Sequence, residues 1–155
     1  MEFEVDAESG LIGKYAVNGV DYLSGDFGIR PNYWRAPNDN DYGNGAPARW
    51  QAWKVYGKEN KPAEVTDKMV DGNRVVKVVY NLEDLGCSNV VTYTLEPSGA
   101  LTVEAQMSEA SLKEAPRYGL RWRMPQEFSN VKFYGRGPWE NYCDRKDGAM
   151  FDIYS

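Results

Sequence analysis

Histidine is absent from the 155 residues, and cysteine occurs only twice, as Cys87 and Cys143. The lack of histidine removes the commonest general base near neutral pH and the commonest metal ligand. Any chemistry of this chain must therefore come from carboxylates, tyrosine, lysine or cysteine. The two cysteines lie far apart in the sequence and can pair only if the fold brings them together, so we expect two unpaired thiols.

Long apolar runs are also missing, since none approaches the roughly 20 residues that a membrane helix needs. Met1 leads directly into a segment, 2–5, that is typical of a strand and not of a signal peptide. We therefore expect a soluble chain with no membrane partner, and the sequence indicates no compartment. Positive charge is scarce, with 18 Lys and Arg against 23 Asp and Glu. Because no basic stripe is available for phosphates, nucleic acid is not an expected partner.

Aromatic residues and tight-turn signals are plentiful. Aromatic side chains make up 14% of the chain, which favours strands because these rings pack well on pleated surfaces. Asn18-Gly19 and Asp71-Gly72 are strong hairpin signals, and Pro97-Ser98-Gly99 marks a further turn. The pattern predicts strands at 3–6, 11–17, 20–22, 64–70, 73–80, 89–95, 101–107, 118–124, 131–134 and 151–155.

Polar and apolar residues alternate in several of these segments. In 101–107 and 118–124 every second residue is apolar, which predicts one buried face, with Trp122 in the core. Helical periodicity is limited to one or two turns at 48–55. Strands joined by tight turns predict an all-β fold, an antiparallel β-sandwich forming a single domain over residues 1–155.

The alternation breaks between residues 30 and 50. Pro31, Pro37 and Pro47 lack the backbone donor that a sheet needs, and Gly43 and Gly45 permit unusual backbone angles. This pattern predicts one long loop, of the kind that usually serves function or an interface.

Carboxylate and amide side chains cluster within that loop, at 38–43. Such oxygen atoms suit calcium, but the helix-loop-helix spacing fails: with Gly43 in sixth place, the fifth residue is Tyr42 and the twelfth is Arg49, where glutamate is required. We therefore predict no metal site. Instead we expect the Asp and Asn side chains to close a tight turn on their own backbone, with Arg35 paired to one carboxylate.

A second unusual segment spans residues 134–146. Two glycines flank Arg136, which suggests close backbone approach with the guanidinium held at a fixed point. Glu140 and Asp144 resemble an acid pair, but a retaining glycosidase needs its carboxyls about 5 Å apart, and this spacing does not ensure that. Arg136 and Arg145 crowd the same stretch, so ion pairing is the favoured interpretation and we predict no catalytic residue.

Trp34 and Trp139 flank the two segments and are the candidates for sugar contact, because pyranose faces stack on aromatic rings. The alternative is that such residues belong to the core of the sandwich.

The two segments together resemble the signatures of the C-terminal β-domain, or small chain, of β-galactosidases of glycoside hydrolase family two. In that family an Arg-Ala-Pro-x-Asp-Asn-Asp sequence opens a loop beside the mouth of the active site. The resemblance places Arg35, Asp39, Asn40, Asp41 and Gly43 in this active-site-proximal loop. It assigns the second motif to Gly135, Arg136, Gly137, Pro138, Glu140, Asn141, Tyr142, Asp144 and Arg145.

The resemblance implies a parent enzyme that hydrolyses terminal β-galactosides with retention, through two glutamates in a separate catalytic barrel domain. The chain itself would be inactive, with no cofactor of its own, while the parent uses Mg and Na. It would form the N-terminal half of a larger sandwich, related to the galactose mutarotases. The expected partners are the catalytic barrel, a β-galactoside or galactose, and a second copy of the chain that covers the exposed face or edge of the sandwich.

Two other functions stay open at this point. A carbohydrate-binding module would hold sugar without cutting it and would need exposed aromatic rings beside 39–41 or Arg136. A mutarotase-like epimerase follows from analogy of fold alone, and such enzymes rely on histidine, which this chain lacks.

Overall fold

The computed structural model describes residues 1–25, 27–58, 61–108, 115–139 and 145–155. The chain divides into two compact units, Met1–Arg123 and Met124–Ser155, and each is described by itself.

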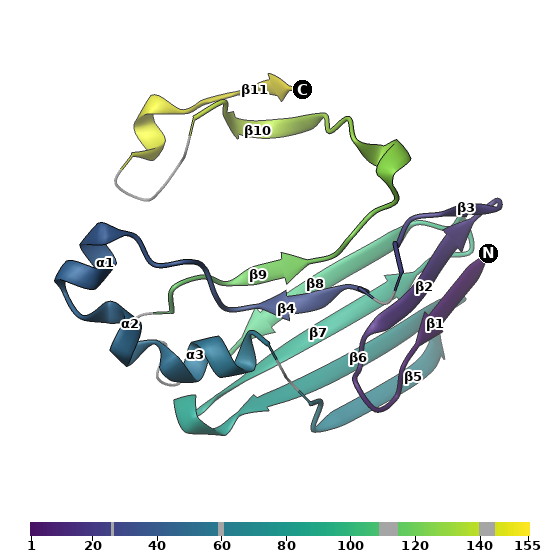
Figure 1. Ribbon diagram of the computed structural model, residues 1–155. Coiled ribbons are helices and arrows are strands. Elements are labelled where there is room, and N and C mark those ends of the chain that lie inside the picture. Colours follow the sequence, from purple (N-terminus) through teal and green to yellow (C-terminus); the bar gives the residue numbers. More distant parts are fainter. Residues whose placement is uncertain (26, 59–60, 109–114, 140–144) are drawn as a thin grey trace. The chain divides into compact units, whose positions relative to one another are not determined.

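A four-stranded antiparallel sheet is the larger layer of the first unit (Figure 1). Its strands follow one another in sequence order, joined by short turns: β5 (Glu64–Val70), β6 (Asn73–Leu82), β7 (Cys87–Leu95) and β8 (Leu101–Met107). The predicted Asp71-Gly72 turn is confirmed, since both residues have positive φ, at 48° and 81°. A one-turn 3-10 helix, η1 (Glu83–Leu85), joins β6 to β7.

The second layer lies over one face of that sheet (Figure 1). It contains a small sheet of β1 (Glu2–Val5), β2 (Ile12–Val17) and β3 (Val20–Asp21), and an antiparallel pair of β4 (Arg30–Asn32) and β9 (Gly119–Arg121). Three short helices follow β4: α1 (Asp39–Gly43), α2 (Ala46–Arg49) and α3 (Gln51–Tyr56). The predicted all-β antiparallel sandwich is confirmed.

Alternation along β6 and β7 builds the core between the layers. On β7 every odd-numbered residue from Cys87 to Leu95 is buried, and on β6 the even-numbered residues from Val76 to Leu82 are buried. The second layer contributes large side chains to the same cluster: Phe3, Ile12, Tyr33, Trp50 and Trp53. Burial of each such side chain contributes about 1.5–3 kcal/mol to stability. Tyr33 and Trp50 lie on either side of residues 34–43, which carry the first motif, so packing against the sheet fixes both ends of this segment.

The prediction of one long loop at 30–50 is wrong. Pro31 lies within β4, which is tolerated because β4 pairs on one side only, with β9. Pro47 occupies the first turn of α2, where its missing N–H is not needed. The helical turns predicted at 48–55 are present as α2 and α3, which are divided at Trp50.

The prediction that Trp122 lies in the core is also wrong, because its side chain is 51% exposed. The strand predicted at 118–124 is shorter, since β9 ends at Arg121. Beyond that point Arg123 bonds to the chain before β4 instead, through Ser24 N (3.0 Å) and Phe27 O (3.4 Å). Trp122 therefore lies beyond the paired segment of this strand.

The second unit is a two-stranded antiparallel hairpin of β10 (Phe133–Gly137) and β11 (Met150–Tyr154), with 3-10 turns η2 (Gln126–Phe128) and η3 (Lys146–Gly148). The strand predicted at 131–134 lies two residues later and runs through both glycines. A Cβ at Gly137 would lie 2.9 Å from the Tyr154 ring, so glycine permits the close pairing. Many apolar side chains of this hairpin are 45–75% exposed: Phe133, Tyr134, Met150, Phe151 and Ile153.

Two further sequence predictions concern cysteine and membranes. Cys87 is a free, buried thiol, while Cys143 lies outside the described residues. Within the ranges given above, no helix has the length and apolar character that a membrane span requires.

Candidate functional site

The first motif begins at a point anchored to the large sheet. Tyr33, fully buried at the end of β4, accepts a hydrogen bond on its hydroxyl from Asn89 Nδ2 of β7, at 2.7 Å. Asn89 Oδ1 in turn accepts from the Tyr118 hydroxyl at 2.9 Å, and the Tyr33 and Tyr118 rings stack. Burial raises the pKa of Tyr33 well above its usual value, so this hydroxyl stays neutral. The chain is therefore held in place one residue before Trp34.

An ion pair within the motif braces the loop. Arg35 donates from Nη1 to Asp41 Oδ2 at 2.5 Å and from Nη2 to Asp41 Oδ1 at 2.9 Å. Asp41 also accepts from the Asn38 backbone N–H at 2.8 Å, while Asn38 Oδ1 accepts from Asp41 N at 3.1 Å, which forms a capping box at the start of α1. The predicted tight turn and the predicted Arg35 pair are both confirmed. These bonds, the Arg35 bond above all, lower the pKa of the Asp41 carboxyl.

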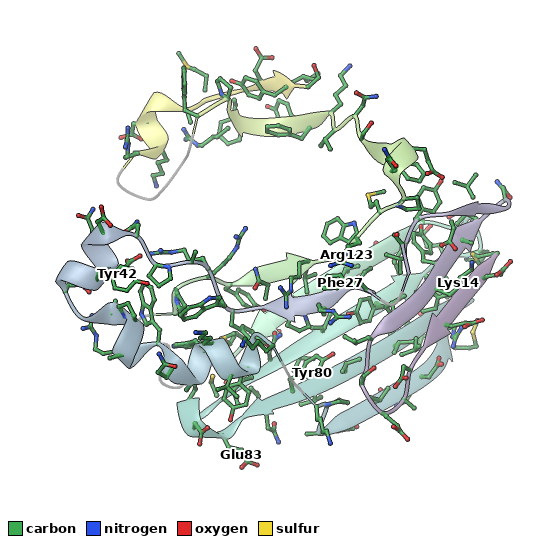
Figure 2. All side chains as sticks on the ribbon, viewed as in Figure 1. Lys14, Phe27, Tyr42, Tyr80, Glu83 and Arg123 are labelled. Atoms are coloured by element: carbon green, nitrogen blue, oxygen red, sulfur yellow. The ribbon has the colours of Figure 1, made fainter. Side chains whose placement is uncertain are left out.

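The other residues predicted to lie near the active site, which are in α1, are exposed to solvent. Asp39, Asn40 and Gly43 are all exposed, and so is Tyr42, at 65%. Figure 2 labels Tyr42 on α1. The structure thus separates Asp41, which is buried against Arg35, from its two polar neighbours. The part of the chain that the structure describes holds no group of three or more Cys, Asp and Glu residues suited to a metal ion.

The two tryptophans predicted to contact sugar, Trp34 and Trp139, differ in how much of their rings is exposed. Trp34 is half-buried against the core, its ring packs edge-on against Trp50, and Lys54 Nζ lies 5.5 Å from its centroid. Trp139 is 74% exposed. The face of Trp34 is thus shared with a cation and a neighbouring ring, while Trp139 offers far more free surface for stacking.

Arg136 fixes the hairpin of the second motif. Its Nη1 donates to two backbone carbonyl oxygens at the two ends of η3, Lys146 O at 2.8 Å and Ala149 O at 2.9 Å, and its guanidinium lies 4.6 Å from the Phe151 ring. The prediction of a guanidinium held at a fixed point is confirmed.

The other residues of the second motif are described only in part. Gly135 and Gly137 lie in β10, followed by Pro138, and Arg145 lies at the start of η3. Glu140, Asn141, Tyr142 and Asp144 lie outside the described residues, so their pairing stays a prediction.

The two anchoring residues, Tyr33 and Asn89, were not among the residues predicted from the sequence. Asn89 carried a signal, because it is the one amide among the apolar inward positions of a strongly alternating strand. A fully buried side-chain amide needs partners, so its presence there predicts a polar neighbour from the facing layer.

The carboxyl groups with shifted pKa values point away from acid catalysis. Hydrogen bonds lower the pKa of Asp6, Asp21, Asp41 and Asp67, from Ser9 backbone, Lys14, Arg35 and Arg74 respectively. A general acid at neutral pH needs the opposite shift. These four groups remain ionised and suit bracing rather than proton donation.

Comparison with known proteins assigns the family. A family model described as "Beta galactosidase small chain" matches residues 1–155. A β-galactosidase of Priestia megaterium is 36% identical over 96% of this chain, and one of Streptococcus thermophilus is 34% identical over 88%. A third, of Alteromonas mediterranea, is 32% identical over 99% of this chain.

These alignments cover only 14%, 13% and 16% of the three relatives' own lengths. The relatives are thus far longer than this chain, and the similarity is to one part of each. The match of the family model, over every residue from first to last, shows that the chain belongs to the β-galactosidase small-chain family.

Proposed function

We propose that this chain is the non-catalytic β-domain of a retaining β-galactosidase of glycoside hydrolase family two. The parent enzyme hydrolyses terminal β-galactosides, with both catalytic glutamates in a barrel domain outside this chain. This chain contributes half of a galactose-mutarotase-like supersandwich and is inactive by itself. Its membership of the β-galactosidase small-chain family supports this role.

The braced loop is the observation that carries the proposal. Arg35 and Asp41 are joined by two hydrogen bonds, and the same carboxylate closes the capping box of α1. The brace leaves Asp39, Asn40 and Tyr42 exposed on α1, whose first turn it holds in place. A wall of an active site needs this combination, because substrate must meet groups that are already in position.

The test is hydrolysis of an aryl β-galactoside by the parent enzyme carrying Asp41→Asn. We expect kcat/KM to fall roughly tenfold to a hundredfold, since small displacements of positioning groups have effects of that size. Asp67→Asn is the matched control, because it removes a similar Arg–Asp pair, with Arg74, on β5 and β6. An equal, small effect of both variants would contradict the role of the loop.

The hairpin of the second unit supports a further part of the proposal. Two-stranded hairpins are marginally stable alone, and β10 and β11 expose large apolar side chains on a narrow ribbon. We propose that the rest of the parent covers this surface, and that the isolated chain covers it by self-association. We propose that the Mg and Na of the parent bind outside this chain.

A carbohydrate-binding module is the second candidate, favoured by the exposure of Trp139 beside the fixed Arg136. Titration of the ¹⁵N-labelled chain with galactose tests it. Binding by a module predicts shifts at 39–43 and around Arg136 that Trp139→Ala abolishes, with Trp34→Ala as the second variant. No shifts in the millimolar range favour the scaffold.

A further inference from the structure

The dipeptide Asn-Gly occurs twice in this chain, at Asn18-Gly19 and at Asn44-Gly45. In this dipeptide the asparagine side chain is readily attacked by the next backbone nitrogen, because glycine has no side chain to shield that nitrogen. Both dipeptides are exposed to solvent. The structure holds the reacting groups of the two dipeptides in different ways, so we expect their reactivity to differ.

The first dipeptide forms the tip of the hairpin of β2 and β3 (Figure 1). Asn18 and Gly19 have positive φ, at 52° and 79°, and Val17 pairs with Val20, which confirms the predicted two-residue turn. Among the described residues, the Asn18 side chain has no hydrogen-bond partner, and the Gly19 backbone N–H donates to no acceptor. No hydrogen bond therefore restrains the side-chain amide or the nitrogen that would attack it.

The tip of this hairpin is weakly held. β3 contains two residues, and two residue pairs join it to β2. A Cβ at Gly19 would have no described atom within 4 Å, so the tip borders open space. Beyond β3, Tyr22 N donates to Tyr15 O at 2.9 Å, so the tip can open while the base of the hairpin stays closed. Local opening is enough to bring the Gly19 nitrogen to the side chain before it.

The second dipeptide is held by hydrogen bonds on both reacting groups. The attacking nitrogen, Gly45 N, donates to Tyr42 O at 3.1 Å. The amide under attack is held through Asn44 Oδ1, which accepts from Ala46 N at 3.0 Å. Asn44 N also donates to Asn40 O at 3.2 Å, at the end of α1. Because these bonds fix the turn between α1 and α2, they must break before this asparagine can react.

We propose that Asn18 is a site of spontaneous deamidation in the folded chain and that Asn44 is protected. The Gly19 nitrogen loses its proton to solvent and attacks Asn18 Cγ, which forms a C–N bond and closes a succinimide ring. The bond between Cγ and Nδ2 breaks, and the amide nitrogen takes up a proton and leaves as ammonia. Water then opens the ring at either carbonyl carbon, which yields aspartate or isoaspartate at position 18.

Either product changes the hairpin. Both products add a negative charge at its tip. The isoaspartate form also places an extra carbon in the backbone of the turn, so Val17 and Val20 no longer meet in the same register. The pairing of β3 with β2 therefore weakens as the protein ages. This reaction does not depend on the proposed role in a β-galactosidase.

Mass spectrometry of peptides from the full chain, after incubation in mildly alkaline buffer, tests the proposal. Exchange of an amide for a carboxyl group changes the peptide mass, and fragment ions locate the change. We expect Asn18 to deamidate at least about tenfold faster than Asn44, because two hydrogen bonds hold the reacting groups of the second site. In urea, where neither turn is formed, the two rates should become similar. Equal rates in the folded chain, or a difference that persists in urea, would overturn the proposal.

A variant assigns the reaction to one residue. Asn18→Gly removes the amide and keeps a residue that tolerates positive φ in the turn, so the fold should be retained. The mass change should disappear from the peptide that contains position 18, while the slow reaction at Asn44 stays as it was. Persistence of the change in that peptide would place the reaction at another residue and contradict the assignment.

Discussion

Replacing Asn89 by alanine tests how the first motif is anchored. Asn89 is fully buried on β7 and links two tyrosine hydroxyls at one end of the β4–β9 pair, where Tyr33 follows β4 and Tyr118 precedes β9. The substitution removes both hydrogen bonds. Tyr118 is 43% exposed and recovers a water partner, whereas Tyr33 is fully buried and does not.

The magnitude follows from this difference. A buried hydroxyl left without a partner costs about 1–3 kcal/mol, and the net loss of a typical hydrogen bond adds about 1 kcal/mol. We therefore expect the free energy of unfolding to fall by about 2–4 kcal/mol. Tyr118→Phe, which leaves the Tyr33 bond intact, should cost less, about 1–2 kcal/mol.

Urea unfolding followed by tyrosine and tryptophan fluorescence measures these changes, provided that the slope with denaturant is unchanged. Asn81→Ala is the matched control, because Asn81 is an exposed amide on neighbouring β6, and we expect less than about 0.5 kcal/mol there. A loss for Asn89→Ala as small as that of the control would show that Asn89 does not anchor Tyr33.

Three further predictions concern the core, pH and assembly. Trp53 is buried and Trp122 is exposed. Trp53→Ala should therefore lower the free energy of unfolding by about 3–5 kcal/mol, and Trp122→Ala should lower it by no more than about 1 kcal/mol. Similar losses for the two variants in urea unfolding would contradict the assignment of Trp53, and not Trp122, to the core. The hydrogen bond from Arg74 lowers the pKa of Asp67 below 3.8, so the stability that this pair contributes is present above that pH and is lost as the pH falls. Asp67→Asn should therefore make the free energy of unfolding less dependent on pH in this acid range, and an unchanged dependence would refute the shift. Phe151→Lys should reduce concentration-dependent association in sedimentation velocity, whereas unchanged association would place the contact elsewhere.

The strands of the large sheet were predictable because each pairs with at least one neighbouring strand. The predicted bounds of β5 and β8 match the structure, and β6 and β7 extend by two residues each. Their alternation records burial on one face only, which is a local property of the sequence. The Arg35–Asp41 pair was predictable for a similar reason, since its partners lie six residues apart.

Features that depend on pairing partners were not predictable in this way. The alternation of 118–124 continues past Arg121, but nothing in the segment shows that β9 ends there or that Trp122 turns to solvent. Pro31 suggested a loop, because the sequence does not reveal that β4 has a partner on one side only. The Tyr33–Asn89 bond joins residues 56 positions apart and depends on the stacking of the two layers.

Hydrolysis of an aryl β-galactoside, measured side by side for the parent enzyme and for this chain, tests whether the chain is a non-catalytic domain of a β-galactosidase. We predict that the parent hydrolyses the substrate with retention and that the isolated chain does not hydrolyse it at all. An inactive intact parent would contradict the β-galactosidase assignment, and hydrolysis by the isolated chain would contradict its non-catalytic role.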